Sequence, residues 1–256
     1  MTLAIVTITR NDLAGLRRTL ASVEAQTTPP DDHWIIDGAS TDGTREYLDS
    51  LPHSPNRHFI SESDRGIYDA MNKGVSKAST DFVWFLNSGD TCADAAVVAE
   101  LGEALGARPG LAALYGKIWR QNSHGLRSVG GPVLARDFRV QMPVCHQALV
   151  YRRAHLLAHP YPTHYRLISD WIVTRDLFAS GAAVAYLDRH LAIYDLNGVS
   201  SHSHWAVLRE KLNHDRRLLK RLHILLVAGT YASALWLAHR TVLYSIIKKR
   251  QHTPRS

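Results

Sequence analysis

The first hundred residues alternate between short apolar runs and segments with helical periodicity. Apolar, largely β-branched or aromatic runs predict buried strands at 3–9, 33–37, 58–61 and 81–86. Apolar residues three or four positions apart predict an intervening helix from Leu13 to Val23, with Asn11 as its N-cap. Further helices are expected up to Leu51, capped by Thr41 or Asp42, over 67–78 and over 93–105, followed by a strand in 111–116.

Strands that alternate with helices predict a doubly wound α/β fold with a mostly parallel sheet and helices on both faces. Ligands of such sheets bind beyond the carboxyl ends of the strands. Polar residues occur at those ends, namely Thr9, Asn11, Asp37, Asp64 and Asp90. We expect them to meet at one edge, although polar turn residues after a strand are also common without any function.

The turn after the first strand separates this chain from two related α/β classes. It reads TITRND and contains no glycine before Gly15. A dinucleotide-binding fold would place G-x-G-x-x-G there. A nucleotidyltransferase would place a glycine-rich phosphate loop with a basic residue there, so both classes are disfavoured.

Charge and cysteine content do not separate function classes for the first part of the chain, because the basic residues concentrate near its C-terminal end. The sequence has 256 residues, is 45% hydrophobic and carries a formal net charge of +7, with the basic residues concentrated after Arg209. Cys92 and Cys145 show no pairing signature, and MTLAIVTITR does not have the pattern of a signal peptide. These features predict reduced thiols and a cytoplasmic location.

The C-terminal part predicts a different kind of segment, and we divide the chain into a catalytic domain at 1–205 and a helical tail at 206–256. Residues 222–239 contain no Asp, Glu, Lys or Arg and are flanked by basic stretches. We favour an amphipathic helix on the inner leaflet of the cytoplasmic membrane. A helix packed on the catalytic domain or on a dimer partner, and a true membrane span, remain alternatives.

Five segments occur in an order that resembles the family 2 glycosyltransferases of the GT-A fold. They are IVTITRNDLAGLRRTLASVEAQ, IIDGASTDGT, SDRGIYDAMNKGVSKASTDFVWFLNSGD, CHQALVYRR and ISDW, within residues 2 to 200. The similar branch comprises bacterial enzymes of exopolysaccharide and cell-envelope glycolipid assembly. The resemblance implies a GT-A-type catalytic domain and an enzyme that transfers a sugar from a nucleotide donor.

The resemblance also implies roles for single residues. Thr9 and Asp37 match positions that contact the base and ribose of the nucleotide, and Asp64 matches an acid that shapes the nucleotide pocket. Asp90 matches the last acid of a D-x-D-type metal motif, and Asp170 matches the catalytic base. The chain departs from the usual motif because Asn87 and Gly89 stand where acids are common.

The residue types suit that chemistry. A leaving diphosphate needs its charge neutralised, and Mg²⁺ or Mn²⁺ bound by Asp90 and by the phosphates themselves would do so. An N-cap role for Asp90 is the alternative. Asp170 could take the proton of an acceptor hydroxyl, which would give inversion with a single base, or it could simply cap a helix.

Other candidates are assigned to the two substrates. The nucleotide-sugar group comprises Thr9, Asn11, Asp37, Asp64, Arg65, Asn72, Lys73 and Ser88, although a plain helix surface explains Lys73 equally well. His146 and Gln147 are predicted at the pocket or acceptor side, and the ring of Trp171 is predicted to stack on a sugar.

We therefore expect an inverting glycosyltransferase that uses a UDP- or GDP-linked donor and a glycan or lipid-linked acceptor. Expected partners include the inner membrane surface but no nucleic acid, and a homodimer is left open. The alternatives are a sugar-phosphate nucleotidyltransferase and a non-catalytic basic protein that binds membranes. The non-catalytic alternative leaves the acids at the strand ends unexplained.

Overall fold

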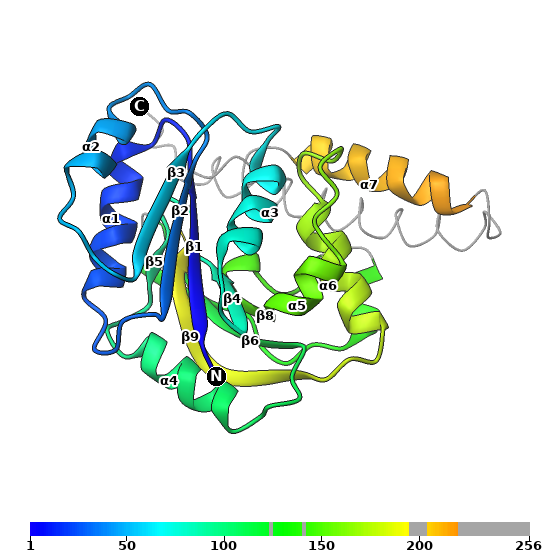
Figure 1. Ribbon diagram of the computed structural model, residues 1–256. Coiled ribbons are helices and arrows are strands. Elements are labelled where there is room, and N and C mark those ends of the chain that lie inside the picture. Colours follow the sequence, from blue (N-terminus) through cyan, green and yellow to red (C-terminus); the bar gives the residue numbers. More distant parts are fainter. Residues whose placement is uncertain (123–124, 140–141, 195–203, 220–256) are drawn as a thin grey trace, which may run out of the picture.

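The computed structural model describes residues 1–122, 125–139, 142–194 and 204–219 (Figure 1). In chain order its helices and strands are β1 (Leu3–Thr9), α1 (Leu13–Glu24), β2 (Asp32–Asp37), α2 (Thr44–Ser50), β3 (Arg57–Ser61), α3 (Ile67–Lys77), β4 (Phe82–Phe85), β5 (Thr91–Cys92), α4 (Val97–Gly106), β6 (Ala113–Asn122), β7 (Gly125–Val129), β8 (Leu149–Arg152), α5 (Arg153–Ala158), α6 (Ser169–Ala179), β9 (Val184–Tyr194) and α7 (His204–Leu219). Two short 3-10 helices, at Ala135–Arg139 and His146–Ala148, complete the described elements.

One sheet organises the described part of the chain. Its strand order is β3-β2-β1-β4-β8-β6-β9-β5, and β7 pairs with β6. Strands β3, β2, β1 and β4 are mutually parallel, as the alternating pattern predicts. Strand β8 is antiparallel to both β4 and β6, whereas β9 is parallel to β6. The α/β fold class is confirmed, and the second half of the sheet adds antiparallel pairs.

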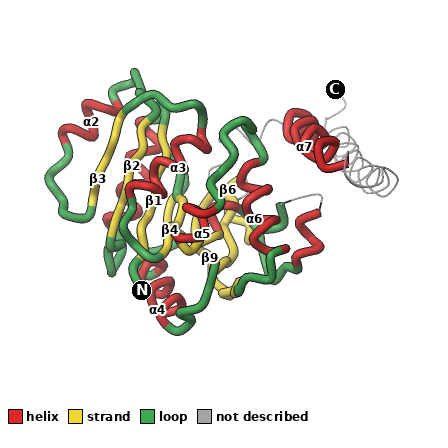
Figure 2. Tube along the Cα trace, turned by 45° about the vertical axis from the view of Figure 1, so that its right-hand side comes forward, coloured by secondary structure: helices red, strands yellow, loops and turns green. Residues whose placement is uncertain are grey.

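Helices cover both faces of the parallel half (Figures 1 and 2). Neighbouring residues of β2 point to opposite faces, so Ile35 packs with Leu16 and Leu20 of α1 while Ile36 belongs to the core below α3. Helix α3 approaches the sheet closely through Gly74, where an added Cβ would lie 2.3 Å from Val6 Cγ1. This close packing holds α3 directly against β1 and β2.

Three predicted helix starts or caps are wrong. The N-cap of α2 is Gly43, not Thr41 or Asp42. Asp12, not Asn11, caps α1 through a bond from Gly15 N, while Asn11 has a positive φ of 51° and lies in the preceding turn. The helix expected at 93 begins at Val97, because residues 91–92 form β5 instead. Asp90 is therefore not a helix cap, which removes the structural alternative considered for it.

The tail is described only in part. Helix α7 crosses the expected boundary at residue 205 and packs on the segment before α6 (Figure 1). No helix within the described ranges is long and apolar enough to cross a membrane. The apolar segment 222–239, on which the membrane prediction depends, lies outside the described residues.

Candidate active site

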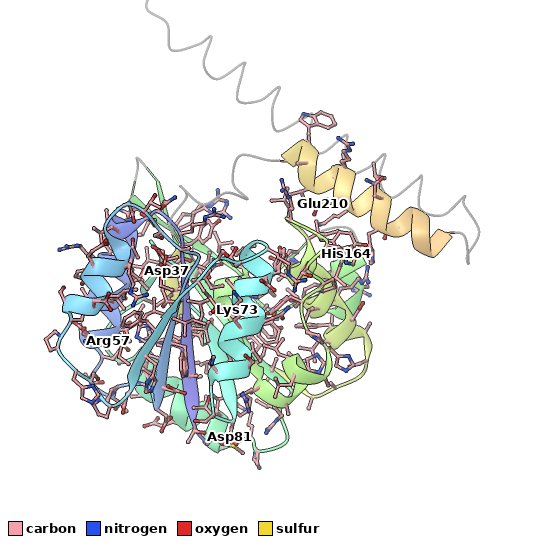
Figure 3. All side chains as sticks on the ribbon, turned by 45° about the horizontal axis from the view of Figure 1, so that its top comes forward. Asp37, Arg57, Lys73, Asp81, His164 and Glu210 are labelled. Atoms are coloured by element: carbon pink, nitrogen blue, oxygen red, sulfur yellow. The ribbon has the colours of Figure 1, made fainter. Side chains whose placement is uncertain are left out.

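The ends of the parallel strands lie together at one edge of the sheet, here called the strand-end edge. Thr9 and Asp37 are register partners at the ends of β1 and β2. Gly38 N donates to Thr9 O at 3.0 Å, and Ser88 N donates to Ile8 O at 3.0 Å. In Figure 3 Asp37 lies at this edge and Asp81, which precedes β4, at the opposite edge. The predicted convergence of the strand ends is therefore present.

Asp37 is fully buried and shapes the loop that follows it. Its carboxylate accepts hydrogen bonds from the backbone N–H and the hydroxyl of Ser40 and from the hydroxyl of Ser61. Ser40 in turn accepts from Asn11 N at 2.7 Å, and Asn11 Oδ1 accepts from Thr41 N at 2.8 Å. Asp37 and Asn11 thus brace the two turns that would face a nucleotide.

Asp64 lies directly against the residue after Asp37. A Cβ on Gly38 would be 2.5 Å from Asp64 Oδ2, so glycine at this position leaves room for the carboxylate. The other oxygen, Asp64 Oδ1, accepts from Gly66 N at 2.8 Å just before α3. The loop after β3 therefore places the Asp64 carboxylate against Gly38, the residue that follows Asp37 at the end of β2.

Thr9 and Ser88 also lie at the strand-end edge, Thr9 at the end of β1 and Ser88 in the turn after β4. Thr9 is 2% exposed, and its hydroxyl has no hydrogen-bond partner among the described residues. Ser88 Oγ donates to Asp12 Oδ2 at 2.8 Å and ties the turn after β4 to the start of α1. Thr9 thus keeps an unused polar group beside the candidate nucleotide site, whereas the hydroxyl of Ser88 is already used.

Three predicted nucleotide contacts on or before α3 have partners within the protein. Arg65 pairs with Asp69 at 3.0 Å, and Lys73 pairs with Glu62 at 2.8 Å. Asn72 donates to Tyr161 O at 2.8 Å and accepts from Tyr161 N at 2.9 Å. Asn72 therefore holds the segment around Tyr161, and the prediction that its amide contacts the nucleotide has no support in this geometry.

Asp90 is held in a tight turn after β4. Gly89 has a φ of 94°, a left-handed conformation that favours glycine. The turn is fixed by Thr19 of α1, whose hydroxyl donates to Asp90 O at 2.7 Å and accepts from Gly89 N at 3.0 Å. The Asp90 carboxylate accepts from Gln147 Nε2 at 3.0 Å. Gln147 therefore positions the proposed metal ligand through a neutral amide.

Asp170 lies in the first turn of α6. Its Oδ1 accepts from Trp171 N at 2.8 Å and from the hydroxyl of Tyr68 at 2.9 Å. The positive end of the helix dipole stabilises a negative charge at this position. Tyr68 belongs to α3, which starts beside Asp64, so this contact links the catalytic candidate to the strand-end edge. Sequence reasoning missed Tyr68 because the hydrogen bond spans 102 residues.

Asp90 and Asp170 act electrostatically on one common neighbour. Burial raises the pKa of the Cys145 thiol to about 12, and both carboxylates add to that rise. Cys145 also donates through Sγ to Gln147 Oε1 at 2.9 Å. The metal candidate and the base candidate, from two different halves of the chain, thus both raise the pKa of the same thiol.

Trp171 and His146 lie beneath the surface. Trp171 is 2% exposed, its indole N–H donates to Phe138 O at 2.8 Å, and Arg175 lies over its ring. His146 is 6% exposed and its Nε2 is 2.9 Å from Tyr161 Oη. Burial lowers the pKa of His146. The burial of Trp171 contradicts its predicted stacking on a sugar, and the burial of His146 gives no support to its predicted place at the acceptor side.

We predict that Tyr68→Phe lowers kcat about tenfold and leaves nucleotide affinity unchanged. The change removes one hydrogen bond to a charged group while keeping the ring, which stacks on Tyr161 at a centroid distance of 5.8 Å. Steady-state kinetics would check this, with Tyr47→Phe on α2 as the control. Unchanged kcat would show that the Tyr68 hydroxyl does not position Asp170.

The turn after β4 offers a divalent cation one carboxylate, that of Asp90. No group of three His, Cys, Asp or Glu side chains that could hold a metal occurs within the described ranges. Mg²⁺ commonly takes one or two carboxylates and completes its shell with substrate phosphates and water. The oriented Asp90 carboxylate suits such a substrate-completed site, and it does not suit an all-protein cage.

The similar proteins described below are all glycosyltransferases. The family described as "Glycosyl transferase family 2" matches residues 4–129. The uncharacterized glycosyltransferase Rv1514c of Mycobacterium tuberculosis is 39% identical over 151 residues, 57% of this chain and 57% of the relative. The chain thus spans just over half the length of that relative. A PGL/p-HBAD biosynthesis glycosyltransferase of Mycobacterium bovis is 30% identical over 231 residues, 88% of this chain and 89% of the relative.

Solved structures show the same fold at low sequence identity. S. aureus TarS 1–349 in complex with UDP has a TM-score of 0.64 at 18% identity, covering 76% of this chain and 60% of TarS 1–349. The mannosyltransferase PcManGT of Pyrobaculum calidifontis in complex with GDP-Man and Mn²⁺ has a TM-score of 0.59 at 19% identity, covering 81% and 60%. These similarities establish the architecture of the described part.

Proposed function

The chain belongs to the family 2 glycosyltransferases, and we propose that it is an inverting, metal-dependent enzyme of that family. It would move a sugar from a nucleotide-diphosphate donor to a hydroxyl of a glycan or lipid-linked acceptor in polysaccharide or glycolipid synthesis. The observation that carries the proposal is the arrangement of Asp37, Asp64 and Asp90 at the strand-end edge, with Asp170 joined to it through Tyr68.

The donor would bind across the ends of β1 and β2. Thr9 and the Asp37 loop would take the base and ribose, and Asp64 would close the pocket beside Gly38. Arg65 and Lys73 could exchange their present carboxylate partners for phosphate oxygens. Structures of similar fold bound to UDP, UDP-GlcNAc and GDP-Man support a UDP- or GDP-linked donor.

Asp90 would hold the metal, with Gln147 keeping its carboxylate in place. A bound Mg²⁺ or Mn²⁺ would neutralise the charge that develops on the leaving diphosphate. The Mn²⁺ in the complex of the similar mannosyltransferase supports this choice of ion. Asn87 and Gly89, which replace acids in the motif, leave Asp90 as the only carboxylate among residues 87–90.

Asp170 would remove the proton from the acceptor hydroxyl. A carboxylate anchored by Tyr68 and by its own helix presents a fixed acceptor for that proton. Because one base activates one incoming hydroxyl, attack from the face opposite the leaving group would invert the anomeric centre. The acceptor would approach from the side of α6.

The acceptor and the cellular location are proposed from a similar protein and from the charge of the C-terminal part. The similar mycobacterial protein is named for PGL/p-HBAD biosynthesis, which supports a glycolipid or glycan acceptor. A lipid-linked acceptor makes attachment to the cytoplasmic face of the membrane useful, and the basic residues after Arg209 would favour it. A homodimer remains an open alternative, and we propose no role in nucleic-acid binding.

A thermal-shift screen tests the proposal without knowledge of the acceptor. UDP, GDP and dTDP are compared, each with Mn²⁺ and with excess EDTA. A ligand at 100 times its Kd adds about 2.7 kcal/mol of stability, which raises the Tm of a domain of this size by roughly 5–10 °C. One nucleotide should raise the Tm, and more so with Mn²⁺. No shift with any nucleotide would contradict the proposal.

Turnover is then measured with the sugar donor of the selected nucleotide. The readout is release of nucleoside diphosphate in the presence of detergent-solubilised bacterial envelope lipids, which contain candidate acceptors. Omission of the lipids gives the background of donor hydrolysis. This turnover assay serves for the variants described below.

A further inference from the structure

We propose that Lys211 of α7 is a positioning residue for the Asp170 carboxylate, so that the C-terminal helix forms part of the catalytic site. The inference rests on the proposed function, since it assumes that Asp170 is the base. Like Asp170, Lys211 lies outside the region matched by the family model, which ends at residue 129. The argument depends on how α7 is anchored, where Lys211 lies and which charges surround it.

Helix α7 is fixed to the segment that leads into α6. The carboxylate of Glu210 accepts from Arg166 N at 2.9 Å and from Leu167 N at 2.9 Å. His214 Nδ1 is 2.8 Å from Tyr165 Oη. Figure 3 shows Glu210 on α7 above the segment that carries His164. These bonds hold α7 against residues 165–167, which shortly precede Asp170 in the sequence.

Lys211 points into this contact. It is 8% exposed, and its Nζ lies 4.5 Å from the centroid of the Trp171 ring. The backbone N–H of the same Trp171 donates to Asp170 Oδ1 at 2.8 Å. The ammonium group therefore lies against the residue that holds the catalytic candidate, on the side opposite to the exposed Arg209 and Trp205 of α7.

The charges around Lys211 favour a link to Asp170. Burial lowers the pKa of Lys211 to about 8, while Asp170 and Asp215 oppose that lowering and Arg175 adds to it. The packed elements also carry Tyr68, His164, Tyr165, Arg166, Asp176, Glu210 and His214 as titratable or charged groups. A buried ammonium loses hydration, and an apolar side chain of similar length could fill the same space. Because packing alone does not need an ammonium group at this position, we assign the Lys211 charge an effect on the Asp170 carboxylate.

The role has a consequence for the direction of the Asp170 carboxylate. Tyr68 and Trp171 N both bind Oδ1. Attraction from Lys211 would restrain the remaining rotation of the carboxylate and of the α6 terminus that carries it. Loss of the charge should therefore reduce kcat and leave donor binding, which is assigned to residues at the ends of β1, β2 and β3, unchanged.

The test compares Lys211→Met, Lys211→Arg and the control Arg209→Met in the full chain. Lys211→Met removes the buried charge, Lys211→Arg keeps it, and Arg209→Met removes an exposed charge two residues away on the same helix. In the turnover assay, Lys211→Met should lose about tenfold in kcat with unchanged donor KM. Arg209→Met should match the wild type, and Lys211→Arg should recover most of the activity.

The pH profile separates a charge effect from a packing effect. The ammonium is charged below its pKa of about 8 and neutral above it, so wild-type kcat should fall as pH rises through 8. Lys211→Arg stays charged and should lose this fall, whereas Lys211→Met should lack it at a uniformly low kcat. If Lys211→Met does not fold, the profile of Lys211→Arg still decides the question.

Failure of this inference can be told apart from failure of the proposed function. If Asp170→Asn is inactive while Lys211→Met has wild-type kcat and pH profile, only the role of Lys211 is overturned. If Asp170→Asn keeps full turnover, the base assignment and the Lys211 proposal both fall. An alkaline fall in kcat that persists unchanged in Lys211→Arg would also contradict the role of Lys211.

Discussion

Asp90→Ala is expected to lower turnover by about 10²–10³-fold and to abolish its dependence on Mn²⁺. The change removes the only carboxylate of the turn after β4, so nothing from this turn would hold a cation against the leaving diphosphate. Several kcal/mol of charge stabilisation in the transition state would be lost, and each 1.4 kcal/mol is about tenfold in rate. The turnover assay with Mn²⁺ and with EDTA measures both effects.

The fold should survive this change. The turn is held by Thr19 and Gly89 through bonds to backbone atoms, and these do not involve the Asp90 carboxylate. Asp81→Ala is the matched control, because Asp81 precedes β4 at the opposite edge of the sheet and bonds Thr2. Wild-type, Mn²⁺-dependent turnover in Asp90→Ala would remove this residue from the metal site.

Asp170→Asn should lower kcat by about 10²–10⁴-fold, the usual contribution of general-base catalysis. The amide can still accept from Trp171 N and from Tyr68, so the shape of the site is kept while the proton acceptor is lost. Donor affinity should be unchanged, because the residues proposed to bind the nucleotide belong to other elements. Turnover kinetics and nucleotide titration together check the split.

The control for Asp170→Asn lies on the same helix. Asp176 is exposed on α6 and pairs with Arg175 at 2.8 Å, so Asp176→Asn changes a carboxylate of the same helix that has no bond to Asp170 or Tyr68. It should retain wild-type kcat. Comparable losses in Asp170→Asn and Asp176→Asn would indicate disturbance of α6 and would count against a specific role of Asp170 as the base.

The strand-end edge could be predicted because local patterns determine it. Apolar runs locate β1 to β4, and intervening helices force the strands to be parallel, so Asp37, Asp64 and the turn at Asp90 had to reach the same edge. The antiparallel pairing of β8 with β4 could not be predicted, because the apolar pattern of a short buried strand does not indicate its direction.

Contacts between distant segments could not be predicted. Gln147 meets Asp90 across 57 residues, and Tyr68 meets Asp170 across 102 residues. No periodicity or spacing encodes such pairs. The same limit explains the wrong prediction for Trp171 and the unsupported one for His146. A residue in a motif can support the site from below, as the Trp171 indole does when its N–H bonds Phe138 O and Arg175 covers its ring.

Isothermal titration of the selected nucleoside diphosphate tests the central claim, which is that Asp90 holds a cation against the donor's diphosphate at the strand-end edge. The wild type, Asp90→Ala and Asp170→Asn are each titrated with Mn²⁺ and with EDTA. We predict that Mn²⁺ tightens binding in the wild type and in Asp170→Asn but not in Asp90→Ala. Tightening by the same factor in all three proteins, or in none of them, would contradict the claim.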